Sequence, residues 1–361
     1  MVLLPGGCMI RSVRFLLVMF SVAIVCFILS FVSLSSSDKT WRIAVLYWSM
    51  NIPGQVAMRA GLESEAASFN AAGLQHVTLI PYVAGDGDAG IENQIKQMRA
   101  AIASKVDAII VQPTDNAGLA APLKEANAAG IPVVAYDQYI SGGKLAAYRT
   151  SDNYSAGKLD GEYLSSRFPA GKQIRIILVE YSHVSSTVER VDGFLDGLSS
   201  SGRAYKLLKS YTAVEPVGGA KAAKDIINDF PAKGSVDAIF TVNDGGGLSV
   251  VKGLIAAGRT EILVATVDGD PASVAAIRDG RMIVVDSAQF CGPLGAEAFR
   301  TACSILAKKK VPYHALVPVF PVTRETLNRY PGWMGPIPAD FNKPWPSKEP
   351  QWSGKLKVVR E

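Results

Sequence analysis

The sequence predicts an α/β protein in which parallel sheets form two lobes. Short apolar, β-branched segments, of the kind buried on both faces of a sheet, recur along the chain. Helical segments separate almost every pair of them, which is the alternation of parallel sheets. The strands fall into two runs, and this favours two similar domains over a single sheet. A chain of 361 residues with 48% hydrophobic content is large enough for two cores.

The most regular unit lies in the first run. A strand is expected over 108–111, followed by a helix that Asp115 or Asn116 can cap, and then by a strand over 133–136. Asp137 follows this second strand directly. Ligands of open α/β sheets bind at the carboxyl ends of the strands, so position alone makes Asp137 a candidate for binding.

The other elements follow in order. Strands are expected over 42–47, 77–82, 147–150, 174–179, 205–210, 238–242, 262–267 and 282–286. Helices are expected over 54–70, 89–104, 154–168, 186–199, 218–230, 246–257, 272–279 and 292–308. No close internal repeat accompanies this pattern, so the division into two domains depends on the pattern alone.

The amino terminus has the pattern of a targeting segment. Arg11 and Arg14 precede a long apolar run over 15–32, and small residues follow. This order is that of a secretory signal peptide, although the apolar run is nearly long enough to span a membrane. Residues 1–37 are therefore expected to be a signal peptide cleaved near Ser37 or an uncleaved anchor. Either outcome exports the rest of the chain.

Composition argues against several functions. The net charge of +5 is mild for a nucleic-acid-binding protein. With four cysteines, no CxxC and three histidines, neither a structural zinc site nor a metal or cofactor is predicted. Cys291 and Cys303 lie on one expected helix, separated by a rise of about 18 Å. That is too far for a disulfide, so both are expected to be buried free thiols.

No catalytic arrangement is found, so an enzyme is not predicted. The segment 85–90 fits GxGxxG, but it follows the second strand rather than the first, and no strand about 20 residues later ends in an acidic residue. We interpret it as a turn and helix cap. There is no GxSxG motif and no paired carboxylates, and the hydroxyls near His183 are interpreted as exposed loop groups.

Polar residues do gather at the ends of predicted strands or at the start of the next helix. The set comprises Asp137, Arg190, Asn243, Asp268 and Gln289. Together they are expected to face one another across a cleft between the domains. Carboxylates accept hydrogen bonds from hydroxyls, while Arg and Asn donate them, and this mixture suits a neutral, polyhydroxylated ligand.

The carboxyl-terminal tail over 331–361 differs from the rest of the chain. It holds six prolines and three tryptophans, so it is neither a helix nor a central strand, and its aromatics argue against disorder. We expect it to lie extended across a domain surface, and an arm that binds a partner remains an alternative.

Several motifs follow one another along the chain: PTD, AGIPV, SDNYSAGKLDGEYL, RVDGF, VDGD and AQ. With these motifs in this order, the chain resembles the ribose-type periplasmic sugar-binding proteins of ABC importers over about residues 42–325. The resemblance implies the type I periplasmic binding fold, with two Rossmann-like lobes joined by a three-strand hinge. It divides the chain into three parts. The N-terminal lobe is 41–150 with 291–317, the C-terminal lobe is 151–290 with 318–330, and the tail is 331–361.

The resemblance also assigns residues. Asp137 matches the sugar-binding aspartate of the first lobe. Arg190, Asn243, Asp268 and Gln289 match ligands of the second lobe and the hinge. The three crossovers match 151–152, 289–290 and a point near Pro318.

Some positions depart from the family pattern on the first lobe. Ile52 stands at an asparagine position, Gly54 and Gln55 replace two phenylalanines, and Gln138 follows Asp137 where an arginine is common. Gln138 is therefore a candidate ligand residue, and ribose itself is in doubt.

A replacement for the lost aromatic surface is expected near the end of the first strand. Trp48 or Tyr47 can supply a stacking face, and packing of Trp48 in the core is the equal alternative.

The implied function is that of an exported, periplasmic, monomeric protein that closes on a small sugar or polyol and delivers it to an ABC permease. It would contact the membrane only through an uncleaved leader. The alternative is a sensory receptor that signals to a membrane kinase or chemoreceptor. A sugar-responsive repressor shares the fold but needs a DNA-binding headpiece where this chain has an export signal.

Overall fold

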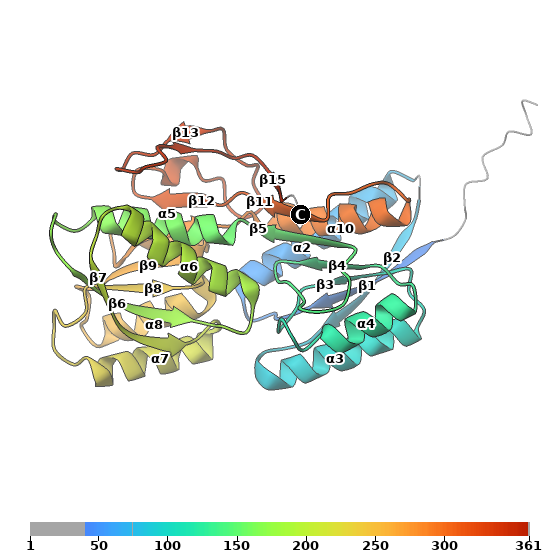
Figure 1. The fold of residues 1–361 in the computed structure, drawn as a ribbon, viewed down its shortest axis with the longest axis horizontal. Helices are drawn as coiled ribbons and strands as arrows, with labels where there is room; N and C mark the ends of the chain where they lie inside the picture. Colours follow the sequence, from blue (N-terminus) through green and yellow to red (C-terminus); the bar gives the residue numbers. More distant parts are fainter. Residues whose placement is uncertain (1–39, 74, 360–361) are drawn as a thin grey trace, which may run out of the picture.

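The computed structural model describes residues 40–73 and 75–359, so the expected leader lies outside the described residues. Two α/β lobes lie side by side (Figure 1). Each has one sheet with helices on both faces, as the alternation of elements predicts. Within these described ranges, no helix is both long and apolar enough to cross a membrane. The same ranges contain no cluster of acidic, His or Cys side chains suited to a metal ion.

The first lobe has a seven-stranded sheet in the order β15-β11-β5-β4-β3-β1-β2. Its strands are β1 (Trp41–Tyr47), β2 (Val77–Val83), β3 (Ala108–Val111), β4 (Val133–Tyr136), β5 (Ala147–Ser151), β11 (His314–Val317) and β15 (Lys357–Val359). All pairs are parallel except β15 with β11. The helices α2 (Pro53–Ala71) and α10 (Cys291–Leu306) cover one face, and α3 (Gly87–Ala103) and α4 (Ala120–Ala128) cover the other (Figure 1).

The second lobe has a six-stranded sheet in the order β12-β10-β9-β8-β6-β7. Its strands are β6 (Ile174–Glu180), β7 (Tyr205–Thr212), β8 (Ala238–Thr241), β9 (Leu263–Asp268), β10 (Ile283–Ala288) and β12 (Phe320–Thr323). Only β12 is antiparallel to its neighbour. Its helices are α5 (Asn153–Ser166), α6 (Ser185–Ser200), α7 (Pro216–Asp229), α8 (Asp244–Ala256) and α9 (Pro271–Arg278).

Alternating burial along the strands explains how each sheet carries helices on both faces. In β1, Ile43 and Val45 pack in one cluster and Ala44 and Leu46 in another, and all four are fully buried. Successive side chains of a strand point to opposite faces, so a continuous apolar run fills both layers. The chain passes between the lobes from β5 to α5, from β10 to α10 and from β11 to β12.

Local details differ from the sequence-based expectations. Asp115 does not cap α4, which begins at Ala120 after Leu119. Its Oδ1 atom instead accepts hydrogen bonds from the backbone N–H groups of Ala117 and Gly118 in a preceding turn. The strands β11 and β12 were not among the expected strands. Pro321 interrupts the pattern of β12, which tolerates it as an edge strand.

The segment 85–90 and the two cysteines behave largely as expected. The segment forms the turn between β2 and α3, with Asp86 at the N-cap position, although its side chain makes no capping hydrogen bond. Cys291 and Cys303 both lie on α10 as buried free thiols.

The tail runs along the second lobe and then returns to the first (Figure 1). After the 3-10 turn η1 (Leu327–Arg329), the strands β13 (Phe341–Asn342) and β14 (Gln351–Trp352) pair with each other. The ring of Trp352 packs 5.3 Å from that of Phe320. The final strand β15 then adds to the edge of the first lobe's sheet. The extended course is thus as expected, but the tail contacts both lobes rather than one surface.

Candidate ligand-binding cleft

A buried cavity lies between the lobes, and all seven residues predicted from the sequence line it. From the first lobe it is lined by Trp48, Ile52, Gly54, Gln55, Met58, Asp137 and Gln138. From the second lobe it is lined by Ser186, Thr187, Arg190, Val214, Asn243, Asp268 and Gln289. The lobes are closed on each other, and the cavity of about 20 Å³ has room for about one water molecule.

Asp137 is the acidic group of the first-lobe wall. It follows β4 with a φ of 64°, a left-handed conformation that non-glycine residues rarely adopt. Its Oδ2 atom accepts hydrogen bonds from Gln112 Nε2 at 2.9 Å and Gln138 Nε2 at 3.2 Å. Its buried Oδ1 atom has no partner among the described residues. Burial raises the pKa of Asp137, while the charge of Arg190 opposes that shift. Asp137 therefore brings an acceptor without a partner in the described part of the chain to the wall of the cleft.

Asp268 is the acidic group of the second-lobe wall, at the end of β9. Its Oδ1 atom accepts from Arg190 Nη1 at 3.1 Å and from Gln289 Nε2 at 2.7 Å. Burial raises the pKa of Asp268 to about 6, although the positive charge of Arg190 acts in the opposite direction. Ser151 Oγ in turn donates to Gln289 Oε1 at 2.7 Å, which joins this network to the first crossing between the lobes.

Arg190 and Asn243 are held inside the second lobe. Arg190 is almost fully buried on α6 and donates through Nε to Asn153 Oδ1 and through Nη1 to the carbonyl of Val242. Asn243 is the N-cap of α8, where its Oδ1 accepts from the N–H of Gly246 at 3.2 Å. Its Nδ2 also donates to the carbonyl of Val214 at 2.8 Å. Asn243 therefore lines the cavity with an amide group already engaged within the lobe.

Gln138 links the two lobes directly. Its Oε1 atom accepts from Ser186 Oγ at 2.7 Å and from the N–H of Ser186 at 3.3 Å. Beside it, Ser185 Oγ accepts from the N–H of Tyr139 at 3.1 Å. These bonds form only when the lobes are together, so they stabilise the closed arrangement.

Trp48 is an apolar contact across the same boundary. Its ring lies 6.1 Å from that of Tyr181 and packs with Val184 and Val214 of the second lobe. Tyr47 does not line the cavity, which makes the alternative expectation for it wrong. It is fully buried in the first lobe, and its hydroxyl donates to Glu63.

The start of α2 lies close to the second lobe. A Cβ atom at Gly54 would lie 3.6 Å from Asp268 Oδ2, so α2 begins almost against that carboxylate. Gln55 Oε1 accepts from the N–H of Ser49 at 2.9 Å, which fixes the orientation of its amide.

Sequence reasoning missed several lining residues. Ser186 and Thr187 lie four and three residues before Arg190 on α6, and therefore on the same helix face. That spacing was the signal that could have found them. Gln112, which positions Asp137, comes directly after β3 at the same sheet edge. Met58 and Val214 carried no such signal.

Two α/β lobes, joined by three crossings and closed over a buried polar cavity, define a binding protein of the type I periplasmic fold. The chain belongs to the family described as "Periplasmic binding protein domain", whose profile matches residues 43–310. Its similarity is to the ribose-type sugar-binding members of that family, which are binding proteins and not enzymes.

The relatives include sugar-binding proteins. The ribose import binding protein RbsB of Escherichia coli K12 is 26% identical over 270 residues, or 74% of this chain and 86% of RbsB. The galactofuranose-binding protein YtfQ of the same organism is 28% identical over 203 residues, or 54% of this chain and 63% of YtfQ.

Solved structures show the same fold. A periplasmic solute-binding protein from Actinobacillus succinogenes with bound D-allose has a TM-score of 0.69 and 24% identity, covering 81% of this chain and all (100%) of that one. The Caulobacter myo-inositol-binding protein has a TM-score of 0.69 and 24% identity, covering 81% and 96%.

Proposed function

We propose that this chain is an exported, monomeric solute-binding protein that captures a small sugar or polyol in the cleft and delivers it to an ABC permease. The observation that carries the proposal is that two polar groups line one cavity from opposite lobes. One is Asp137 with its unpartnered Oδ1, and the other is the hydrogen-bonded pair of Asp268 and Arg190. Hydroxyl groups of a ligand can donate to the carboxylates and accept from the guanidinium.

The charge of the cleft favours a neutral ligand. Two carboxylates and one guanidinium line it, so neither sign dominates strongly. About five hydrogen bonds that involve these charged groups, each contributing about 1.5–3 kcal/mol, would give micromolar or better affinity after the ordering costs. The relatives, which include proteins named for ribose and galactofuranose, support this class of ligand.

Binding requires the lobes to separate and close again. Contacts of Trp48, Gln138 and Ser186 hold the two walls together, and the cavity of about 20 Å³ is too small for a sugar, so a sugar can enter only when the lobes separate. The hinge consists of the three crossings, which we propose divide the chain into 41–150 with 291–317 and 151–290 with 318–330, with 331–361 as a tail. A ligand that contacts both walls stabilises the closed form, which is what a permease would recognise.

One experiment tests binding and export together. The protein recovered from a periplasmic extract is weighed by native mass spectrometry and then heated with a panel of pentoses, hexoses, alditols and cyclitols. Because a ligand binds only the folded state, a sugar or polyol at 100 times its Kd should stabilise it by about 2.7 kcal/mol and raise Tm by several degrees. A mass that lacks residues 1–37 would indicate a cleaved signal peptide, and a mass that includes them would indicate an uncleaved anchor. Stabilisation by amino acids or nucleotides and by no sugar would contradict the proposal.

A further inference from the structure

The tail reaches the base of the cleft through Trp333. The indole Nε1 donates a hydrogen bond to the backbone carbonyl of Asp268 at 2.6 Å. The carbonyl of Trp333 accepts from the N–H of Gly292, in the first turn of α10, at 3.0 Å. Since β9 belongs to the second lobe and α10 covers the first, this tail residue contacts the backbone of both beside the cavity.

The backbone that Trp333 contacts is in an unusual conformation. Asp268 has a φ of 129°, and Gly269 has a φ of 83°. A non-glycine residue keeps such a conformation only when its surroundings fix it. The carbonyl of Asp268 accepts from the N–H of Gln289 as well as from Trp333, and the hydroxyl of Tyr330 donates to the carbonyl of Gly269 at 3.3 Å. Two residues near the start of the tail thus hold consecutive carbonyls at this turn.

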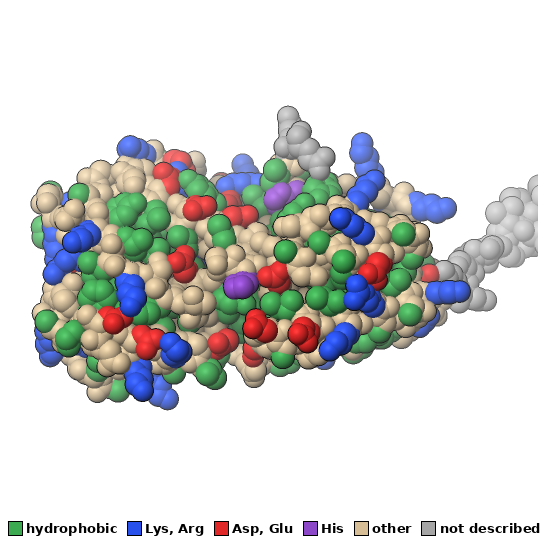
Figure 2. Space-filling view, turned by 60° about the horizontal axis from the view of Figure 1, so that its bottom comes forward, with side chains coloured by type: hydrophobic (Ala, Val, Ile, Leu, Met, Phe, Trp, Pro, Cys, Tyr) green, Lys and Arg blue, Asp and Glu red, His purple; other side chains and the backbone are tan. Residues whose placement is uncertain are grey.

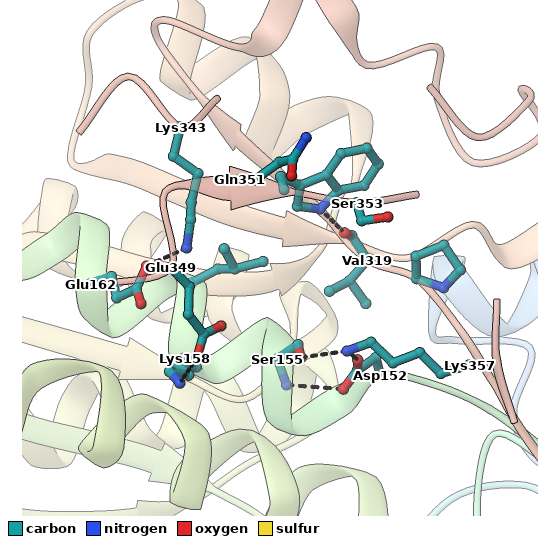
Figure 3. A pocket seen from close by; sticks show the side chains of 13 residues that line it. Asp152, Ser155, Lys158, Glu162, Val319, Lys343, Glu349, Gln351, Ser353 and Lys357 are labelled. Carbon is teal, nitrogen blue, oxygen red and sulfur yellow. Dashed lines mark hydrogen bonds and ion pairs between the residues drawn. The ribbon is translucent and has the colours of Figure 1, made fainter. Parts of the chain in front are cut away.

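Other contacts hold the tail independently of Trp333. Lys343 Nζ lies 2.8 Å from Glu162 Oε2 in an ion pair that is almost fully buried. Trp352 Nε1 donates to the carbonyl of Val319 at 2.8 Å. Figure 3 shows these contacts around a cavity of about 150 Å³ between the tail and α5. A change at Trp333 should therefore leave the tail in place.

We propose that Trp333 is a positioning residue for ligand binding, which fixes the turn that presents the Asp268 carboxylate to the cleft. The proposal depends on the proposed function, because it assigns Asp268 to the ligand. Trp333 itself does not line the cavity, so it acts through the backbone of Asp268.

The test compares Trp333→Phe with Trp345→Phe. Both substitutions keep an aromatic ring and remove one indole N–H. In the described part of the chain, the Nε1 atom of Trp345 is buried without a partner. Removing it should therefore leave the turn at Asp268 unchanged. Each variant, in the full chain, is titrated with D-ribose, D-allose and myo-inositol by calorimetry. Trp333→Phe should weaken whichever of these binds the wild type by about tenfold, and Trp345→Phe should leave the affinity unchanged.

A double-mutant cycle distinguishes positioning from a general structural role. If Trp333 acts through Asp268, then Trp333→Phe should cost little further affinity in an Asp268→Asn background. If the affinity losses of Trp333→Phe and Asp268→Asn add in full in the double variant, the proposal is overturned. Equal affinities of Trp333→Phe and Trp345→Phe would overturn it too.

Hydrogen exchange provides a readout that needs no ligand. The amides of Gly269 and Gln289 should exchange faster in Trp333→Phe than in Trp345→Phe, because they belong to the turn that loses its support. If the wild type binds no sugar but this difference is found, the proposed function fails, whereas the support that Trp333 gives to the turn at Asp268 is confirmed. Unchanged exchange at both amides would overturn the positioning role whatever the ligand.

Discussion

The two walls of the cleft are built differently. On the second-lobe wall, the polar groups of Arg190, Asp268 and Gln289 are already hydrogen-bonded to one another. On the first-lobe wall, Asp137 keeps an unpartnered oxygen and lies among apolar residues such as Ile52 and Met58. The second wall is therefore preorganised, whereas the first keeps a free acceptor beside apolar side chains.

This difference separates two properties of a binding site. A preorganised polar wall contributes affinity, because little ordering is needed when the ligand arrives. The first wall also holds the positions that are expected to depart from the family pattern, Ile52, Gly54, Gln55 and Gln138. We infer that the second wall sets the general affinity for hydroxyl groups and that the first selects among sugars.

Acidic and basic side chains are mixed on one exposed face of the molecule (Figure 2). On the face shown in Figure 2, acidic and basic side chains are interspersed, without a continuous basic strip. This agrees with the mild net charge of +5.

The largest expected effect comes from breaking the second wall. Arg190→Ala should lower the free energy of unfolding by about 3–5 kcal/mol, because it leaves Asp268 as an unpaired buried carboxylate. It should also abolish sugar binding. Urea unfolding measures the first effect and calorimetry the second. Arg281→Ala is the control, because its ion pair with Asp279 is exposed. If Arg190→Ala unfolds at the same urea concentration as this control, the second wall is not organised by Arg190.

As the pH rises, the free energy of unfolding and the affinity for sugar should change in opposite directions. The pKa of Asp268 is raised to about 6 from its ordinary value near 3.8, so the folded state binds the proton more tightly than the unfolded state. Stability of the unliganded protein should therefore fall as the pH rises from about 4 to 6, by at most about 3 kcal/mol. Sugar affinity should rise over the upper part of that window, because the ionised carboxylate accepts hydroxyl hydrogen bonds better.

The variant Asp268→Asn tests whether Asp268 contributes to this pH dependence. Asp244, with a pKa raised to about 7 by burial, acts on stability in the same direction at slightly higher pH. The charge of Asp268 also raises the pKa of Asp244, so the difference in unfolding free energy between wild type and Asp268→Asn reports the titration of Asp268 together with its effect on Asp244. If this difference is the same at pH 4.5 and pH 7, Asp268 does not titrate in this range.

Sequence reasoning reached the fold because its signals are local. The buried strands and the polar residues that follow them, such as Asp137 and Asp268, can be recognised from short segments. The contacts made by lobe closure were not accessible in this way. Gln138 meets Ser186 across 48 positions, and Trp333 meets Asp268 across 65. Nothing in the local pattern near either residue specifies how far the lobes close or where the tail runs.

The smallest expected effect tests whether the first wall adapts. Gln138→Ala removes the hydrogen bonds to Ser186 that form on closing, and a typical hydrogen bond contributes about 0.5–1.5 kcal/mol. If closure is the main role of Gln138, sugar affinity should fall by up to about tenfold. Ser186→Ala should then reproduce the loss, and the double variant should lose little more. An increase in affinity for Gln138→Ala alone would contradict this. It would mean that the amide occupies space the sugar needs, so that the first wall selects by exclusion rather than by closing.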